Sequence, residues 1–480
     1  MQVLSVASEM FPFIKTGGLA DVSGALPRAL GSHGIAVRTM LPCYPAVKRR
    51  LPADASVVHR YDNLFGGQAS IIAAQLEGHD LLLFDAPHLF DRPGGAYGDG
   101  TGNDWADNWR RFAAFSRAAA DVALGAAGDW KADLVQAHDW QAAMTPAYLR
   151  YDQRSAPPSV MTVHNLAFQG RYPASIFSQL GLPAQAMSID GVEYFGGVGY
   201  LKAGLQAASA ITSVSPTYVQ EIRTPEFGMG LEGLINGRGS DLYGILNGID
   251  TKEWDPETDP HLVASYSAKT LARRAANRRA IRERFQLEDD ASPIICVISR
   301  LTWQKGMDIL AAEVGRIVGL GAKLAILGSG DAALEGAFIA AASRHAGRVG
   351  VVTGYDEALA HLLQGGADAI LIPSRFEPCG LTQLYGLRYG CIPAVARTGG
   401  LADTIIDANH AALAAGVATG FQFAPGSGDA MVEGLHRLMT VFRKRKAWSA
   451  LQRQAMKTDV SWDASAAEYA ELFRALASKE

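Results

Sequence analysis

The stretch Lys15-Thr16-Gly17-Gly18-Leu19-Ala20-Asp21 near the start of the chain recurs near its end as Arg397-Thr398-Gly399-Gly400-Leu401-Ala402-Asp403. Each copy follows a short apolar run, residues 1–6 in the first case and 391–395 in the second. A strand that passes through paired glycines into a helix presents bare backbone N–H groups at the helix N-terminus, and these groups attract anions, phosphates above all. Two such junctions predict two α/β halves that face a shared ligand.

Strand-like and helical patterns alternate along the whole chain. Short β-branched runs are separated by Ala-rich stretches, a pattern typical of parallel α/β domains. A chain of 480 residues exceeds one ordinary core, and a turn-forming Asn-Gly pair within residues 244–250 divides the strand candidates into two sets. We therefore predict domains over residues 1–248 and 249–458, and a long loop at 85–110. The expected strands are residues 1–6, 37–40, 81–84, 134–137, 159–163 and 210–214, then 294–298, 323–327, 349–353, 369–372 and 392–395.

The bulk composition excludes several classes of protein. Lys and Arg total 44 against 48 Asp and Glu, a formal charge of −4, which does not favour nucleic acid or an anionic membrane as a partner. The four cysteines are widely spaced and show no metal-ligand pattern. The chain passes from Met1 straight into a strand-like run without a signal peptide, and uncharged stretches such as 411–428 carry Gly, Pro and Ser. We expect a cytoplasmic protein without a membrane span, and nothing in the sequence indicates an oligomeric state.

The first paired-glycine loop offers a candidate phosphate site. Lys15 precedes Gly17 and Gly18 and can add a point charge for a diphosphate whose oxygens also meet the loop amides. The alternative is a plain strand-to-helix turn with a solvated lysine. Asp21, at the start of the helix, equally fits a helix N-cap.

A second cationic loop follows the predicted strand at 294–298. Its sequence Ser299-Arg300-Leu301-Thr302-Trp303-Gln304-Lys305-Gly306 places Arg300 and Lys305 on one strand-to-helix connection. A departing phosphate there would meet both charges and the helix dipole. Because open α/β sheets bind ligands at the carboxyl ends of their strands, we favour a functional role over surface cations that cap a loop.

The densest cluster of candidate residues is Ser374-Arg375-Phe376-Glu377-Pro378-Cys379-Gly380-Leu381-Thr382-Gln383, which follows the apolar run 369–372. Glu377 is expected at the carboxyl end of that strand, beside the helix amides of Leu381 and Thr382. A carboxylate there can hold sugar hydroxyls or face a developing positive centre. The alternative is that Glu377 caps the helix.

Two histidines end predicted strands of the first half, in His138-Asp139-Trp140-Gln141 and His164-Asn165. A lone histidine is more often structural than catalytic. Two such strand ends, with an acid and a tryptophan beside them, favour a carbohydrate site, which needs aromatic faces and polar hydrogen-bonding groups. The sequence has no D-x-D pair and no paired histidine ligands, so we predict no catalytic metal.

A dinucleotide fingerprint occurs at Gly328-Ser329-Gly330-Asp331-Ala332-Ala333, which fits G-x-G-x-x-A after a predicted strand. It follows the second strand of its half instead of the first. The acids at suitable distance, Asp356 and Glu357, lie in a loop after Gly354-Tyr355. A nicotinamide-dependent oxidoreductase is therefore kept only as a rival interpretation.

Together these motifs resemble those of bacterial glycogen synthases and plant starch synthases, which are retaining glycosyltransferases of the two-domain GT-B fold. The resemblance spans essentially the whole chain. It rests on both Thr-Gly-Gly-Leu-Ala-Asp segments, His-Asp-Trp at 138–140, His-Asn at 164–165, the loop 299–306 and the cluster 374–383. It implies two Rossmann-like domains that face an interdomain cleft. We expect these domains to close over donor and acceptor and to expel water that would otherwise hydrolyse the donor. A final helix at 459–480 is implied to cross back to the first domain.

The resemblance implies transfer of glucose from a nucleotide sugar, ADP-glucose in bacteria, to the non-reducing end of an α-1,4-glucan such as glycogen or a maltooligosaccharide. It implies no cofactor and no metal, with the acceptor on the first domain and the donor on the second. Carried over position by position, Lys15, Arg300 and Lys305 contact the donor diphosphate, His164 and Glu377 the transferred glucose, Asp139 the sugar or acceptor side, and Tyr355 and Thr382 the nucleotide.

One position departs from the wider GT-B pattern. Retaining enzymes of this fold often carry a second Glu eight residues after the first, whereas this chain has Tyr385 there, which puts a ribose-binding role at that position in doubt. Two rival functions stay open, a GT-B transferase with a UDP-sugar donor and an inactive glucan-binding protein. The second Thr-Gly-Gly copy is expected either to line the ligand site or only to shape a strand–helix turn.

Overall fold

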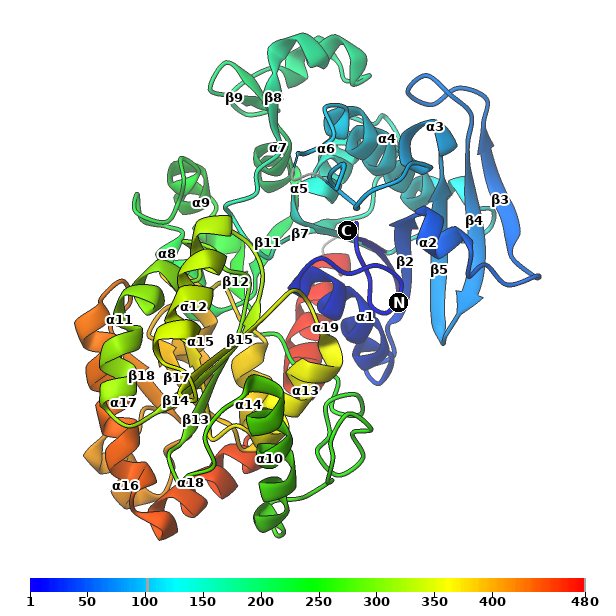
Figure 1. Cartoon of the computed structure of the whole chain (residues 1–480). Helices are drawn as coiled ribbons and strands as arrows, with labels where there is room; N and C mark the ends of the chain where they lie inside the picture. Colours follow the sequence, from blue (N-terminus) through cyan, green and yellow to red (C-terminus); the bar gives the residue numbers. More distant parts are fainter. Residues whose placement is uncertain (101–102, 479–480) are drawn as a thin grey trace. The chain divides into compact units, whose positions relative to one another are not determined.

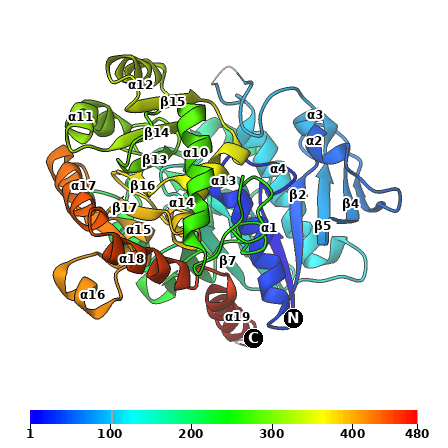
Figure 2. The ribbon, with the colours of Figure 1, turned by 60° about the horizontal axis from the view of Figure 1, so that its bottom comes forward.

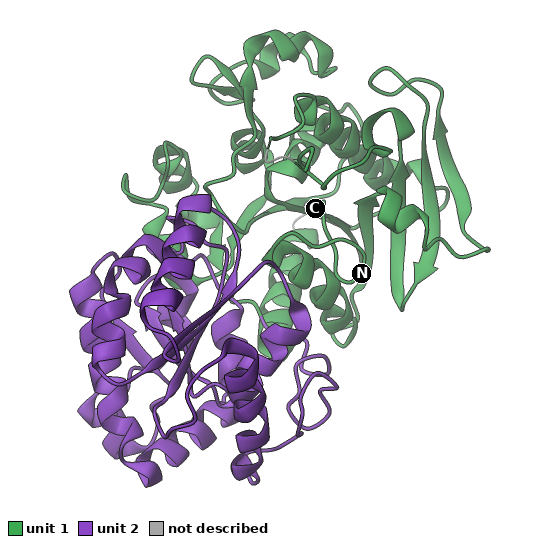
Figure 3. Ribbon diagram, in the orientation of Figure 1, with its two compact units in different colours: residues 1–247, 462–480 green, residues 248–461 purple. Residues whose placement is uncertain are grey.

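The computed structural model describes residues 1–100 and 103–478 and divides the chain into two compact units (Figures 1 and 3). Unit 1 comprises Met1–Asn247 and Trp462–Glu480, and unit 2 comprises Gly248–Ser461. The chain passes from unit 1 to unit 2 within the predicted Asn-Gly turn. Unit 2 ends at Ser461, whereas the second domain was expected to end at residue 458. Residues 101–102 of the expected loop and 479–480 of the expected final helix lie outside the described residues.

Unit 1 is built on a nine-stranded sheet with the order β12-β11-β7-β6-β1-β2-β5-β4-β3. From β12 to β5 neighbouring strands pair in parallel. Most of these strands are apolar runs with little exposure, as expected of parallel strands covered on both faces. The strands are β1 (Gln2–Val6), β2 (Ala36–Pro42), β3 (Ser56–Tyr61), β4 (Ala69–Leu76), β5 (His79–Asp85), β6 (Leu134–His138), β7 (Ser159–Val163), β11 (Ala210–Ser213) and β12 (Leu242–Gly244).

The expectation of a purely parallel sheet is wrong at one edge of unit 1. β3 and β4 pair antiparallel with each other, and β4 pairs antiparallel with β5. β3 is largely exposed. An edge strand with a solvated side lacks the continuous apolar run by which the other strands were predicted. The expected loop at 85–110 is also broken by the short helix α3 (Pro87–Phe90) and by the start of α4 (Asn108–Asp121).

The last helix of the chain belongs to unit 1. α19 (Asp463–Ala477) packs beside α1 (Gly18–Gly31), and Leu26 of α1 shares a small buried core with Phe473 of α19. None of the helices in the described residues is long and apolar enough to cross a membrane. The other α-helices of unit 1 are α2 (Pro45–Lys48), α5 (Asp139–Ala142), α6 (Met144–Arg150), α7 (Tyr200–Ala207), α8 (Pro216–Glu221) and α9 (Glu232–Gly237).

A separate three-stranded antiparallel sheet has the order β8-β10-β9. Its strands are β8 (Arg171–Pro173), β9 (Glu193–Tyr194) and β10 (Gly197–Gly199). In Figure 1 β8 and β9 stand out from the nine-stranded sheet of unit 1, at the top of the view. The sequence analysis did not predict this sheet, because strands of two or three residues are too short to show a period.

Unit 2 contains a six-stranded parallel sheet with the order β15-β14-β13-β16-β17-β18. Helices surround it, with α10 beside α13, α11 beside α17 and α14 beside α18 (Figure 2). The strands are β13 (Ile294–Ile298), β14 (Lys323–Gly328), β15 (Val349–Thr353), β16 (Ala369–Ile372), β17 (Ile392–Ala396) and β18 (Phe421–Phe423). The helices are α10 (Arg274–Phe285), α11 (Met307–Gly319), α12 (Ala332–Arg344), α13 (Glu357–Gly366), α14 (Thr382–Tyr389), α15 (Gly399–Thr404), α16 (His410–Ala415), α17 (Gly428–Phe442) and α18 (Arg445–Lys457).

Candidate active site

Two loops of unit 2 are held together at the carboxyl edge of its sheet. One loop, residues 299–306, follows β13, and the other, residues 373–381, follows the neighbouring strand β16. Gly306 has a φ of 68°, and a Cβ atom at this position would lie 2.0 Å from the carbonyl oxygen of Pro373. Only glycine fits this approach. The loop of Lys305 is therefore fixed against the loop of Glu377.

Arg375 fastens the same two loops. Its guanidinium donates to both carboxylate oxygens of Asp308, at 2.6 and 2.7 Å, and to the carbonyl oxygen of Trp303 at 2.7 Å. A two-pronged contact of this kind is the strongest way in which arginine binds a carboxylate, and the hydrogen bond from Arg375 lowers the pKa of Asp308. The sequence analysis missed this role because the partners are 67 positions apart.

Lys305 and Glu377, two of the predicted catalytic residues, form an ion pair. The Lys305 Nζ lies 2.5 Å from Glu377 Oε2, which also accepts a hydrogen bond of 2.9 Å from the hydroxyl of Ser374. Only 7% of Glu377 is exposed, so removing Lys305 would leave a buried carboxylate without its counter-charge, and removing Glu377 would leave a partly buried ammonium group without one. The alternative that Glu377 caps the helix is wrong, because α14 begins at Thr382 with Leu381 as its N-cap residue.

The other residues predicted to contact the donor lie at the same edge of the sheet. Arg300 is exposed directly after β13, and none of the described carboxylates lies within ion-pair distance of it. Tyr355 is exposed after β15, beyond Gly354, whose φ is 117°. Thr382 is the first residue of α14. The carboxyl ends of β13, β15 and β16 therefore carry all the predicted donor residues of unit 2.

The second Thr-Gly-Gly segment supports the backbone of Glu377. The amide of Gly400 donates to the carbonyl oxygens of Glu377 and Pro378, at 3.2 and 3.1 Å. Gly399 has a φ of 43°, and a Cβ atom there would lie 2.0 Å from the Glu377 carbonyl oxygen. The segment therefore shapes the loop that carries Glu377, which favours the structural alternative for this copy.

Tyr385, at the position where a second glutamate was considered, packs on an indole ring. Its ring stacks on Trp254 with centroids 3.6 Å apart, and His361 stacks on Trp254 at 3.7 Å, so that the indole lies between the two rings. Asp259 joins the same cluster, since it accepts a hydrogen bond of 2.6 Å from the hydroxyl of Tyr389 and lies 2.8 Å from His361 Nδ1. Position 385 thus ties α14 to α13 through aromatic packing.

In unit 1 two histidines meet where the neighbouring strands β6 and β7 end. His138 Nδ1 lies 2.9 Å from His164 Nε2, and His138 Nε2 lies 3.2 Å from the hydroxyl of Ser5. Burial lowers the pKa of His138 well below its usual value and that of His164 to about 3. Both rings are therefore neutral at pH 7, and one donates its N–H to the other.

Asp139 lies beside this pair in the left-handed backbone region, which aspartate tolerates better than most residues. Its φ is 53°, which is uncommon for a residue other than glycine. Its Oδ1 accepts the backbone amide of His164 at 2.7 Å. Burial raises the pKa of the Asp139 carboxyl to about 7, although hydrogen bonds from the amides of His164 and Asn165 oppose the shift. The structure therefore places a carboxyl group that titrates near neutral pH at the strand ends.

The first Thr-Gly-Gly loop binds a carboxylate of the chain itself. Glu9 is buried, and it accepts hydrogen bonds from the amides of Thr16 and Gly17 and from the Thr16 and Tyr97 hydroxyls. The Gly17 amide had been predicted to contact a diphosphate, and here it donates to Glu9 at 3.2 Å. The junction attracts an anion as expected, but the sequence analysis missed that anion because Glu9 lies outside the motif.

Lys15 and Asp21 of the same loop form an ion pair, with Nζ 3.0 Å from Oδ1. Gly17 is the N-cap residue of α1, and Gly18 is its first residue. Asp21 lies in the first turn, where a negative charge favours the helix dipole. The N-cap alternative for Asp21 is therefore wrong.

The glycines of the dinucleotide fingerprint have a packing role. A Cβ atom at Gly328 would lie 1.9 Å from the carbonyl oxygen of Ser299, and one at Gly330 would lie 2.4 Å from that of Leu301. The Gly330 amide donates to Glu335 at 2.8 Å. These glycines let the end of β14 and the turn after it pass against the Arg300 loop, so packing accounts for both of them without a nicotinamide cofactor.

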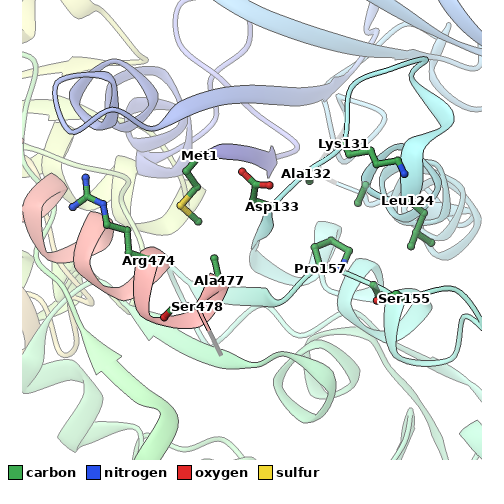
Figure 4. Close-up of a pocket in the computed structure, with 12 residues that line it drawn as sticks. Met1, Leu124, Lys131, Ala132, Asp133, Ser155, Pro157, Arg474, Ala477 and Ser478 are labelled. Atoms are coloured by element: carbon green, nitrogen blue, oxygen red, sulfur yellow. The ribbon is translucent and has the colours of Figure 1, made fainter. Parts of the chain in front are cut away.

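A pocket of about 520 Å³ opens in unit 1 away from these residues (Figure 4). Its lining includes Met1, Asp133 and Pro157, which precede β1, β6 and β7 respectively. The pocket therefore lies at the amino-terminal edge of the sheet, opposite His138 and Asp139. The volume of this pocket is no guide to the catalytic site, because none of the predicted catalytic residues lines it. Within residues 1–100 and 103–478, no group of three or more His, Cys, Asp or Glu side chains is placed to hold a metal.

The two Thr-Gly-Gly copies should respond differently to the same substitution. A Cβ atom at Gly17, whose φ is −162°, meets no atom within 4 Å, whereas Gly399 combines a positive φ with a backbone contact. We expect Gly399→Ala to lower the free energy of unfolding by at least about 1–3 kcal/mol. Gly17→Ala should cost less than about 1 kcal/mol, the loss expected when alanine replaces glycine at a helix N-cap. Urea denaturation of both variants checks this, and equal losses would contradict the unequal roles.

Asp139→Asn should stabilise the protein at high pH. The folded-state pKa of about 7 lies above the ordinary 3.8, so the wild type loses stability relative to the variant as the pH rises from about 4 to about 7. Above that range the variant should be more stable by up to about 4 kcal/mol. His138 and His164 titrate in both proteins, so their effect cancels in the difference. Urea denaturation from pH 5 to pH 8 measures the gap, and a gap that does not change with pH would refute the assignment.

Comparison with known proteins agrees with this arrangement of motifs. Residues 2–237 match the family model of the starch synthase catalytic domain, and residues 278–454 match that of glycosyl transferases group 1. The glycogen synthase of Mesorhizobium japonicum is 66% identical over 479 residues, 100% of this chain and 99% of that protein. Glycogen synthase 1 of Rhizobium meliloti is 59% identical over 480 residues, all of both chains.

Solved structures show the same fold. The catalytic domain of starch synthase IV from Arabidopsis thaliana, bound to ADP and acarbose, has a TM-score of 0.89 at 32% identity and covers 99% of each chain. Sucrose-phosphate synthase of Thermosynechococcus elongatus, at a TM-score of 0.60 and 16% identity over 100% of each chain, shares the fold alone. The GT-B fold and the glycosyltransferase class expected from the sequence are confirmed. The chain belongs to the glycogen and starch synthase family.

Proposed function

We propose that this enzyme transfers glucose from ADP-glucose to the non-reducing end of an α-1,4-glucan, with retention of configuration. The observation that carries the proposal is the Lys305–Glu377 ion pair at the carboxyl edge of unit 2, which joins a phosphate-binding cation to a carboxylate suited to a sugar. Similarity to glycogen synthases over the whole chain supports the reaction. Similarity to a starch synthase structure that holds ADP and acarbose supports the substrates.

Arg300 and Lys305 act on the leaving diphosphate in this proposal. Arg300 presents an exposed guanidinium, and Lys305 has three N–H donors, of which one meets Glu377. As the glycosidic C–O bond breaks, negative charge gathers on the departing phosphate oxygen. Fixed cations at that point stabilise the transition state more than the ground state, which raises kcat. Lys15, paired with Asp21, is the candidate cation from unit 1.

Glu377 supports the sugar as positive charge develops on it. Lys305 and Ser374 hold its Oε2, which fixes the orientation of the carboxylate. A negative group held in this way stabilises an oxocarbenium-like glucose through space. Attack of the acceptor hydroxyl from the face that the phosphate leaves would retain the configuration. A covalent glycosyl–enzyme intermediate is the alternative route to the same outcome.

Asp139 and His164 serve the sugar and acceptor side. Both are held by hydrogen bonds that fix their geometry, Asp139 to the His164 amide and His164 to the His138 ring. A carboxyl group with a pKa of about 7 can accept or donate a proton under working conditions. Tyr355 and Thr382 are proposed to border the nucleotide. All four cysteines are free and buried, which supports the cytoplasmic location that forms part of this proposal.

Lys305→Ala and Glu377→Gln should each lower kcat by about 10²–10³. Each single variant should also lose stability, because it leaves the partner charge buried. The double variant should recover part of that stability without recovering activity. Initial rates of ADP release with glycogen, together with urea denaturation, separate the two effects. Single variants that turn over at the wild-type rate while folded would contradict the proposed roles.

The donor preference and the independence from metal can be measured in one assay. We expect labelled glucose to enter glycogen from ADP-glucose at least about tenfold faster than from UDP-glucose, a difference of about 1.4 kcal/mol in the barrier. Treatment with EDTA should leave the rate unchanged, because positive charge comes from Arg300 and Lys305. Preference for UDP-glucose would favour the rival transferase. Glucan binding without transfer from either donor would favour the inactive glucan-binding protein.

A further inference from the structure

The turn between β9 and β10 carries an aromatic residue in an unfavourable backbone conformation. Phe195 and Gly196 have φ values of 47° and 74°, the pattern of a two-residue hairpin turn with both central residues left-handed. Such turns favour Asn-Gly or Asp-Gly, because few other side chains tolerate the first position. A phenylalanine there destabilises the hairpin locally.

Burial does not compensate for this strain. Phe195 is 66% exposed, so its ring stays largely in contact with water. Neither the backbone preference nor the hydrophobic effect therefore accounts for phenylalanine at the tip of this hairpin. Positions that break local rules without a structural benefit are typical of functional sites.

The ring is held in a built arrangement with two neighbours. Tyr194 contacts it edge to face, with centroids 4.7 Å apart. The guanidinium of Arg171 lies over both rings, 5.9 Å from the Tyr194 centroid and 5.6 Å from the Phe195 centroid, and it donates to the Phe195 carbonyl oxygen at 3.1 Å. We call Arg171, Tyr194 and Phe195 the aromatic tip.

Hydrogen bonds also fix the aromatic tip to the rest of unit 1. The Tyr194 hydroxyl donates to the carbonyl oxygen of Met229 at 3.2 Å, and the Gln169 side-chain amide donates to the same oxygen at 3.2 Å. The carboxylate of Glu193 accepts the amide of Gly196 at 2.7 Å. Side chains held in this way lose little conformational freedom when a ligand binds, which favours affinity.

The aromatic tip lies on the segment that follows His164, one of the residues proposed to contact the sugar. β8 begins at Arg171, seven positions after His164 at the end of β7. Phe168, between them, is 49% exposed. Figure 1 shows this small sheet standing out from the nine-stranded sheet. Seven residues span at most about 25 Å, so a long acceptor can contact the small sheet while its end contacts the strand ends, whereas we expect a short acceptor to reach only the strand ends.

We propose that the aromatic tip binds α-1,4-glucan as an auxiliary contact for polymeric acceptors. The inference rests on the proposed function, because it takes its ligand from the acceptor of that reaction. Arg171 lies over one face of the Phe195 ring, and the exposed remainder of this ring packs on the apolar face of a glucose unit, while the remaining N–H donors of Arg171 suit sugar hydroxyls. The tip raises the affinity for glycogen and leaves the chemical step unchanged.

Phe195→Asn gives a test in which stability and binding move in opposite directions. Asparagine suits a positive φ, so the midpoint of thermal unfolding should stay the same or rise by about 1–3 °C. The dissociation constant for glycogen, measured by affinity electrophoresis without donor, should rise about three- to tenfold. The rate with maltotriose as acceptor should stay within about twofold of the wild type.

Two controls keep the result specific. Phe195→Trp retains an aromatic face and should keep wild-type glycogen affinity. Ile339→Ala removes a side chain that is 52% exposed on α12 of unit 2, and it should change neither binding nor rate.

Unchanged glycogen affinity in Phe195→Asn would overturn the proposal, as would equal losses with glycogen and maltotriose. A change in oligomeric state, detected by light scattering, would assign the tip to contact with a second copy of the chain and would also overturn it. The proposed function fails separately, if the wild type transfers glucose to neither acceptor, since glycogen binding is measured without any donor.

Discussion

Glu377 is held at both its backbone and its side chain, and the arrangement of the loops at the carboxyl edge of unit 2 depends on that double constraint. The Gly400 amide binds its carbonyl oxygen, while Lys305 and Ser374 bind its carboxylate. The backbone contact requires glycine at 399, since a Cβ atom there would strike the Glu377 carbonyl. One carboxylate therefore connects the second Thr-Gly-Gly segment to the cationic loop after β13. The second copy of the repeated motif contributes here through the backbone conformation that its glycines allow.

The carboxyl ends of parallel strands carry different kinds of groups in the two units. In unit 2, Lys305 and Glu377 form an ion pair at the sheet edge, and in the proposed reaction the cation meets the departing diphosphate while the carboxylate meets the sugar. In unit 1, burial makes His138 and His164 neutral and brings the pKa of Asp139 to about 7. Neutral hydrogen-bonding groups suit sugar hydroxyls, which carry no charge. The difference follows from burial and from the partners available, since both sets lie at the carboxyl ends of parallel strands.

The sequence predicted the parts of the fold that depend on local pattern. Buried parallel strands such as β7, β13 and β16 appear as continuous apolar runs, and their carboxyl ends located the motifs. The edge strand β3 and the small sheet lack such runs and were missed, and β4 was missed although its residues 71–74 are apolar. Contacts between distant positions were also missed, as with Arg375 and Asp308 or Glu9 and Gly17. A motif shows which groups a loop offers, whereas their partners depend on the folded chain.

Two residues of unit 1, one at the strand ends and one on the small sheet, have a left-handed backbone. Asp139 and Phe195 have φ values of 53° and 47°, and aspartate tolerates this conformation better than phenylalanine does. Asp139 is buried and keeps its conformation through the His164 amide, whereas Phe195 is exposed and keeps its conformation through Arg171 and the hairpin. In each case the surrounding structure holds the residue in this conformation, and for Phe195 it does so against the residue's own preference. A side chain that must meet a ligand in one orientation benefits from being held in this way, because conformational entropy already lost on folding is not lost again on binding.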